Sequence, residues 1–346
     1  MPTGLISPNP LGVNLFNSLD LLNSFPMSLL RFIKNWTLPI AICFGAIAYF
    51  AYAHLSCFDF SRAYVDRIVA IVQPVLIFSM LFLSFCKIDV RDLRPRISHL
   101  WLLLIQCGSF AALCLIIFFA PQIPGRVLIE AAALCLICPT ATSASVVTQK
   151  LHGSGTEITM YTLLINFAVA ILIPLFVPLL HEHADQSFML ALWSILKKVF
   201  PMLICPLIAA QLVRYCLPRL HRVLTSYHDL AFYLWAVALS IAIAVTTRSI
   251  VHTNHSFFEL AGIAVVSLVC CILQFGLGRL IGRHYNLSVS TCQGLGQKNT
   301  VFAIWVGYTF LNPITSIAGG FYSIWHNLYN TYQLHKDATA DGANGK

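Results

Sequence analysis

The sequence predicts an all-α integral membrane protein: ten transmembrane helices in a 5+5 inverted repeat, two of them broken and crossing each other. Of its 346 residues, 58% are hydrophobic and only 10% are charged, whereas a soluble domain is about a quarter charged. The apolar residues form ten stretches of roughly 20 residues, the length that spans a bilayer as a helix. This composition argues against a water-soluble enzyme. The net charge of +8 comes from basic residues in the short loops between spans, which the positive-inside rule explains better than nucleic-acid binding does.

The ten predicted spans divide the chain into two halves of five. A first five-helix repeat covers 37–180 and a second covers 181–333, with a cytoplasmic tail over 334–346. Residues 1–36 are expected to be an interfacial amphipathic segment, with a disordered tail as the alternative. Asn312-Pro313 should mark the turn between the last two spans, because proline disfavours helix in the residue before it. The spans lie near 37–55, 67–87, 98–120, 126–150, 156–180, 199–217, 228–249, 257–281, 290–310 and 311–333.

The distribution of lysine and arginine predicts the orientation of the spans. With both termini in the cytoplasm, fourteen of the 21 basic residues fall on the cytoplasmic side and six on the other. This excess follows the positive-inside rule and indicates a multi-pass protein of the cell membrane. Because each half has an odd number of spans, the second half must enter the bilayer from the opposite side. Any repeat that relates the two halves is therefore inverted.

The fourth span of each half is interrupted at its middle. In the first half, Pro139 breaks the helix and is followed by the small hydroxyl residues Thr142, Ser143 and Ser145. In the second half, Gly294 and Gly296 precede four polar residues, Gln297, Lys298, Asn299 and Thr300. A lysine near the bilayer centre is costly, so protein or a water-filled cavity must surround it. We therefore expect the segments Pro139–Ser145 and Gly294–Asn299 to be non-helical and to pack against each other.

Three stretches resemble the bile acid:sodium symporter family and its bacterial homologues. They are Gln73–Phe82, Thr142–Thr148 with Gly153 after it, and Gly294–Thr300 with His326-Asn327 in the last span. The resemblance covers about 37–333. It implies a core of spans 3–5 and 8–10, in which the two broken helices cross, and a panel of spans 1, 2, 6 and 7. It also implies that an organic anion binds between core and panel, and that two sodium ions bind behind the crossing.

The sequence departs from the family at the sodium sites. The family's glutamate aligns with Gly294 and its glutamine with Lys298, and a Ser-Asn pair aligns with Ala144-Ser145. Since an ammonium carries the same charge as sodium, Lys298 is expected to take the place of a cation and to bond the carbonyls freed by the break. Two alternatives stay open: a sodium site rebuilt from Thr142, Ser143, Ser145 and Glu157, and an ion pair between Glu157 and Lys298. Glu157 is also explained as a helix N-terminal carboxylate, next to Thr156 or Ser154 as the capping residue.

These patterns predict a secondary transporter that moves an organic anion by alternating access and does not depend on sodium. The lipid bilayer is its other partner, and no nucleic acid, metal or catalytic residue is expected. The expected binding residues are Pro139, Thr142, Ser143, Ser145, Glu157, Gly294, Gly296, Gln297, Lys298, Asn299 and Thr300. A transport-inactive receptor or scaffold with the same fold is one alternative. A membrane-embedded enzyme is another, although the sequence offers no clustered acid, base or metal set. The substrate and the oligomeric state are not specified by these patterns.

Overall fold

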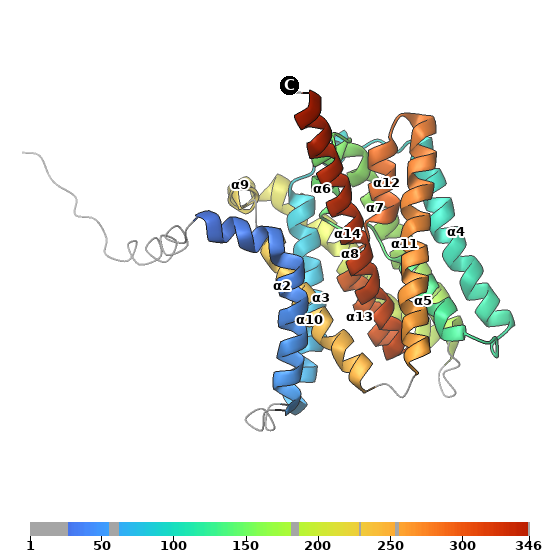
Figure 1. Cartoon of the computed structure of the whole chain (residues 1–346). Helices are drawn as coiled ribbons and strands as arrows, with labels where there is room; N and C mark the ends of the chain where they lie inside the picture. Colours follow the sequence, from blue (N-terminus) through green and yellow to red (C-terminus); the bar gives the residue numbers. More distant parts are fainter. Residues whose placement is uncertain (1–26, 55–61, 181–186, 228–229, 253–255, 345–346) are drawn as a thin grey trace, which may run out of the picture.

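The computed structural model describes residues 27–54, 62–180, 187–227, 230–252 and 256–344, and it is helical almost throughout (Figure 1). The only extended pairing within these ranges is one isolated antiparallel bridge between Thr140 and Lys298. The elements are α2 (Met27–His54), α3 (Arg62–Cys86), the 3-10 turn η2 (Val90–Asp92), α4 (Ile97–Phe119), α5 (Arg126–Ile137), α6 (Ala144–Lys150), α7 (Gly155–Leu180), α8 (Phe188–Cys216), α9 (Pro218–Ser226), α10 (Leu230–Val251), α11 (Phe257–Tyr285), α12 (Ser288–Gly296), α13 (Thr300–Phe310) and α14 (Pro313–Asn344).

Six of these helices are long and apolar enough to cross a membrane: α3, α4, α7, α8, α10 and α11. Two shorter apolar stretches, Pro39–His54 of α2 and Thr300–Phe310, add to them. Many large apolar side chains point outward from the bundle, including Phe44, Ile71 and Leu104, as expected where lipid rather than water surrounds the protein. The chain is therefore a multi-pass membrane protein.

The helix ends differ from the predicted spans in three places. The first part of α2, dark blue in Figure 1, lies across the direction of the rest of that helix, and Pro39 lies within α2. Of the predicted segment 1–36, residues 1–26 lie outside the described part of the chain, and 27–36 belong to α2. Helix α8 begins at Phe188 rather than near 199, because Ser187 caps it by accepting from the Leu190 amide at 3.4 Å. Helix α14 continues to Asn344, so 334–344 extends the last helix instead of forming a separate tail.

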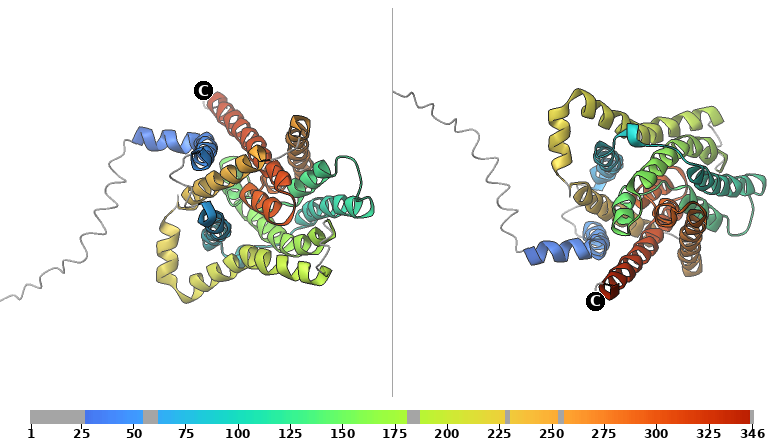
Figure 2. Two further views of the ribbon diagram at one scale, coloured as in Figure 1. Left: turned by 90° about the horizontal axis from the view of Figure 1, so that it is seen from below. Right: turned by 90° about the horizontal axis from the view of Figure 1, so that it is seen from above.

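The helices form two groups that pack side by side. Helix α2 packs on α10, α3 packs on both α8 and α10, and these four form the panel. Helices α4, α5, α7, α11, α12 and α14 contact one another in several pairs and form the core, together with α6 and α13. Figure 1 shows α2 and α10 on one side and α4 and α11 on the other, and Figure 2 shows the same grouping along the bundle axis.

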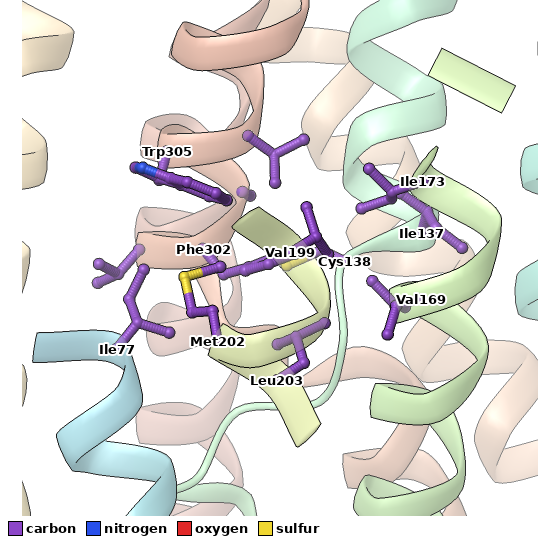
Figure 3. Packing of buried hydrophobic residues seen from close by; sticks show 14 of the residues in the cluster. Ile77, Ile137, Cys138, Val169, Ile173, Val199, Met202, Leu203, Phe302 and Trp305 are labelled. Atoms are coloured by element: carbon purple, nitrogen blue, oxygen red, sulfur yellow. The ribbon is translucent and has the colours of Figure 1, made fainter. Parts of the chain in front are cut away.

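The buried apolar centre lies where the two groups meet. Figure 3 shows Phe302 and Trp305 of α13 next to Ile77 of α3 and to residues of α8, with Cys138 close by. Phe302 and Ile77 are fully buried. A second, smaller apolar cluster around Phe275 and Tyr322 packs α11, α12 and α14 together on the far side of the break. Both breaks are thus enclosed by packed side chains.

Candidate functional site

The two helix breaks meet in the middle of the bundle, main chain against main chain. The Ala141 amide donates to the Gln297 carbonyl at 2.9 Å, and the Asn299 amide donates to the Pro139 carbonyl at 2.8 Å. These two bonds flank the antiparallel bridge between Thr140 and Lys298. Within the two interrupted spans, the chain is non-helical only over 138–143 and 297–299. The breaks are therefore shorter than predicted, because Ala144-Ser145 belongs to α6 and Gly294–Gly296 to α12.

Gln106 of α4 compensates for the break after α5. Pro139 provides no amide, so the last carbonyls of α5 lose their helical donors. The Gln106 side-chain amide donates to the Ile137 carbonyl at 3.2 Å and to the Cys138 carbonyl at 2.8 Å. Its own oxygen accepts from the Tyr161 hydroxyl of α7 at 2.7 Å. The residues Gln106, Ile137, Cys138 and Tyr161 are all buried. Gln106 therefore connects α4, α5 and α7 through buried hydrogen bonds that use both its amide nitrogen and its oxygen.

At the second break, side chains from both halves of the chain donate hydrogen bonds to the free carbonyls. The Thr140 hydroxyl donates to the Gly294 carbonyl at 2.7 Å, and the Tyr322 hydroxyl of α14 donates to the Gly296 carbonyl at 2.8 Å. Asn299 caps α13 by accepting from the Phe302 amide at 3.2 Å. The Cys138 thiol donates to the Asn299 carbonyl at 2.8 Å. The carbonyls freed at the two breaks therefore have donors other than Lys298.

Lys298 lies at the centre of this crossing, with 1% of its surface exposed. Its amine has no hydrogen-bond partner among the described residues. This corrects the expectation that the ammonium would bond the freed carbonyls, since amides, hydroxyls and a thiol occupy them. The buried carboxylates Glu130 and Glu157 pair with Arg126 and with Arg96 and His99, respectively. Lys298 therefore brings an amine to the site without a built-in negative partner.

The remaining predicted residues divide into those at the crossing and those away from it. Gln297 donates to the Ser143 hydroxyl at 3.0 Å, which ties the two breaks together through side chains as well. Thr300 is buried at the start of α13, and Thr142 and Ser145 are half-buried beside the first break.

Glu157 is not at the crossing. Its carboxylate lies 2.8 Å from the Arg96 guanidinium and 3.3 Å from His99 Nε2. Its amide donates to Ser154 at 3.3 Å, as the capping explanation predicts.

This geometry bears on both alternatives that the sequence leaves open for Glu157. Glu157 pairs with Arg96 instead of Lys298, so the predicted Glu157–Lys298 ion pair is wrong. The same pairing removes the carboxylate from a site rebuilt around Thr142, Ser143 and Ser145. Within the described residues, no three His, Cys, Asp or Glu side chains are grouped so that they could hold a metal ion.

A cavity of about 950 Å³ lies between the panel and α13. It occupies the half of the bundle that contains the end of α2 and the beginning of α3, opposite the C-terminal end of α14 (Figure 1). Its walls are mostly apolar. The polar or aromatic residues that line it are Tyr49, Tyr52, Gln73, Lys198, Arg248, Trp305, Tyr308 and Thr309.

Several residues of the site were missed by reasoning from the sequence. Gln106 is a single amide within an apolar span, and that signal alone would have marked it as a contact residue. Lys198 was assigned to a loop because the predicted span began at 199. Arg248 was assigned, like Lys198, to the loops on the non-cytoplasmic side, and no sequence pattern places the two residues in one cavity.

Comparison with known proteins adds no relative: neither the family models nor the curated protein sequences that were searched match this chain.

Proposed function

We propose that this chain is a secondary transporter of the bile acid:sodium symporter type, which moves an organic anion by alternating access. The observation that carries the proposal is the meeting of two interrupted helices, main chain to main chain, in the centre of an apolar bundle. Interrupted helices in corresponding positions of two halves are typical of transporter binding sites. The cavity of about 950 Å³ beside α13 has a size suited to a small organic molecule.

The packing supports an inverted repeat of five and five helices. An inverted repeat pairs α2 with α8, α3 with α10, and α4 with α11. The contact between α2 and α10 then corresponds to the contact between α8 and α3, and both are present. The contacts of α4 with α5 and α7 correspond likewise to those of α11 with α12 and α14. The two reciprocal hydrogen bonds at the bridge are also what a two-fold axis through the crossing would generate.

We further propose that both termini lie on the cytoplasmic side. We also propose that transport does not require sodium. Lys298 supplies a single positive charge at the crossing, and the Arg96 and His99 side chains engage Glu157 elsewhere. Lysine differs from sodium in that it can lose its charge by releasing a proton. A transporter with this crossing is therefore expected to couple to protons or to operate as a facilitator.

Uptake into proteoliposomes tests the proposal. Labelled taurocholate, a bile acid, is offered in sodium or choline medium to the native protein and to Lys298→Gln. Equal uptake by the native protein in both media is the expected result. A strong sodium requirement in the native protein would refute the role of Lys298, whereas sodium dependence that arises only in Lys298→Gln would be its strongest support.

The same preparation separates the rival functions. A receptor or scaffold would bind the anion, detected as a shift in melting temperature, but would show no uptake with or without an imposed proton gradient. A membrane-embedded enzyme would convert a substrate into product during the incubation. The Arg96, His99 and Glu157 side chains form an acid–base group that the sequence did not predict, and their mutual pairing explains it as a structural contact.

A further inference from the structure

Helix α9 connects two membrane-crossing helices of the panel without being one of them. Helix α8 ends at Cys216, directly before α9, and α10 begins at Leu230, shortly after it. We propose that α9 lies in the surface of the membrane and binds the headgroups of anionic phospholipids through Arg219 and Arg222. This proposal concerns the lipid around the protein, so it holds whether or not the chain is a transporter.

The orientation and level of α9 place it at the membrane boundary. Both views of Figure 2, which look along the bundle, show α9 lengthwise, so it lies across the direction of the spans. The His221 ring donates from Nε2 to the carbonyl of Cys86, the last residue of α3, at 2.7 Å. Helix α9 is therefore held at the level where α3 and α8 both end. Ends of apolar spans mark the boundary between the hydrocarbon and the headgroups.

The residues of α9 and its two flanking positions divide into three faces at helical spacing. The first face meets the protein, because His221 bonds the end of α3 and Leu224 packs against the apolar core. The second face carries the exposed apolar side chains of Leu217, Leu220, Val223 and Tyr227. The third face carries Arg219 and Arg222, which are also exposed. Residues three or four apart share a side of a helix, so each set is contiguous.

The exposed apolar face calls for lipid rather than water. Its four side chains each leave 44–52% of their surface uncovered by the protein. A helix with one apolar and one basic face lies in the membrane interface with its apolar face buried about 5–10 Å into the boundary of headgroups and acyl chains. Tyr227 adds an aromatic ring with a polar end, which is typical of residues at this depth. The apolar face is therefore expected to insert into the lipid beside the panel.

The basic face selects among lipids by charge. Helix α9 contains no acidic residue. The nearest carboxylate in the sequence is that of Asp229, outside the described residues, so 217–229 contains two arginines against one aspartate. A guanidinium can bond two phosphate oxygens at once. The distribution of basic residues predicts that α9 is on the cytoplasmic side, where the leaflet carries anionic lipids. Arg219 and Arg222 should therefore attract a lipid such as phosphatidylglycerol in preference to neutral phosphatidylcholine.

Fluorescence quenching of a bimane label at position 223 tests this preference. A cysteine-free chain carrying Val223→Cys is labelled and placed in phosphatidylcholine nanodiscs that contain doxyl-labelled phosphatidylglycerol or, at the same mole fraction, doxyl-labelled phosphatidylcholine. The anionic quencher should be at least about fivefold more effective, the order expected for one basic residue near a charged lipid surface. High salt should reduce this ratio by screening the charges. A label at position 226, on the basic face, should be quenched more by aqueous iodide than the label at 223 is.

The double variant Arg219→Gln/Arg222→Gln should bring the ratio of the two quenchers close to one without changing the melting temperature. Arg219→Lys/Arg222→Lys keeps the charges and should keep most of the preference, so it reports on the site even if the glutamine variant folds poorly. The matched control is Arg94→Gln/Arg283→Gln, which removes two exposed arginines that the sequence places on the same side of the membrane. It should leave the ratio unchanged.

Four results would overturn the proposal. Equal quenching by the two lipids in the chain with both arginines would show that α9 does not select by charge. Equal losses in the two glutamine variants would show that the attraction is a property of the whole surface. A label at 223 that iodide quenches better than lipid would place the apolar face in water. A label at 223 that neither quencher reaches would show that a second copy of the chain, or residues 1–26, covers this face instead of lipid.

Discussion

Replacing Gly296 by alanine should destabilise the crossing, because the new methyl group has no space. A Cβ at position 296 would lie 2.3 Å from Cδ1 and 2.4 Å from Cγ of the Phe275 ring. Carbon atoms in contact are normally about 3.5–4.0 Å apart. The ring cannot move away easily, since Phe275 is 2% exposed and its centroid lies 4.2 Å from that of Tyr329. Either α12 or the Phe275 ring must shift.

The expected cost follows from two opposing effects. Overpacking a dense core typically costs about 1–3 kcal/mol, while replacing a helical glycine by alanine stabilises by about 0.5–1 kcal/mol. Three ring atoms of Phe275 lie within 2.6 Å of the new methyl group, which favours the upper part of the overpacking range. The net loss of unfolding free energy should be about 1–2 kcal/mol. A loss of this size corresponds to a fall of roughly 2–6 °C in melting temperature for a chain of a few hundred residues.

Thermal unfolding in detergent, followed by tryptophan fluorescence, measures this effect. The matched control is Gly276→Ala on α11, one residue after Phe275, where a new Cβ meets nothing within 4 Å. Its melting temperature should equal or exceed that of the native protein. Adding Phe275→Leu to Gly296→Ala removes part of the ring and should cost less than the sum of the two single changes. A Gly296→Ala protein that melts at or above the native temperature would refute this description of the contact.

Three other changes have defined outcomes. Gln106→Leu should lower the melting temperature by more than Gly296→Ala does, because it leaves the buried Ile137 and Cys138 carbonyls without donors, and each unpaired carbonyl costs about 1–3 kcal/mol of unfolding free energy. Gln106→Glu should not restore stability, because a charged carboxylate has no hydrogen to donate. The Lys298→Met protein should melt at or above the native temperature, since the Lys298 amine has no hydrogen-bond partner among the described residues. The same change should abolish uptake. A fall in melting temperature would instead indicate an anionic partner of Lys298. Single cysteines at 184 and 346 in a cysteine-free chain should label from opposite sides of the membrane, and labelling from one side would refute the ten-span topology.

Much of the fold was predictable because a bilayer imposes helix length and backbone pairing. Both interruptions were evident from local chemistry: Pro139 removes a donor, and the glycines before Gln297 weaken a helix. The turn at Asn312-Pro313 was also predicted, and α13 ends at Phe310 while α14 begins at Pro313. These features depend on residues close together in the sequence. The capping of α7 by Ser154 is another local feature that the sequence predicted.

The partners of the polar residues were much less predictable, because they lie far apart in the sequence. Gln106 reaches carbonyls 31 and 32 residues away, and nothing local to it specifies them. The sequence favoured Glu157 as a helix N-terminal carboxylate and left an ion pair with Lys298 as an alternative, but the arrangement of α4 and α7 determines that it meets Arg96. The start of α8 was misplaced because Lys197-Lys198 resembles a loop by charge alone. The helix continues through them because one lysine covers Trp193 and the other lines the cavity.

The distribution of satisfied bonds indicates where the molecule can move. Reciprocal amide bonds and the side chains of Gln106, Thr140 and Tyr322 satisfy the carbonyls at the two breaks. Opening the crossing would expose several buried polar groups at once, at a cost of about 1–3 kcal/mol each. By contrast, α13 meets the panel through the apolar centre around Phe302 and Trp305 and across a mostly apolar cavity. Sliding apolar surfaces past each other breaks no hydrogen bond, so we expect α13 and the crossing to move together as part of a rigid core. If the chain transports as proposed, the cavity at Trp305, rather than the break at Lys298, would change shape between the two states that alternating access requires.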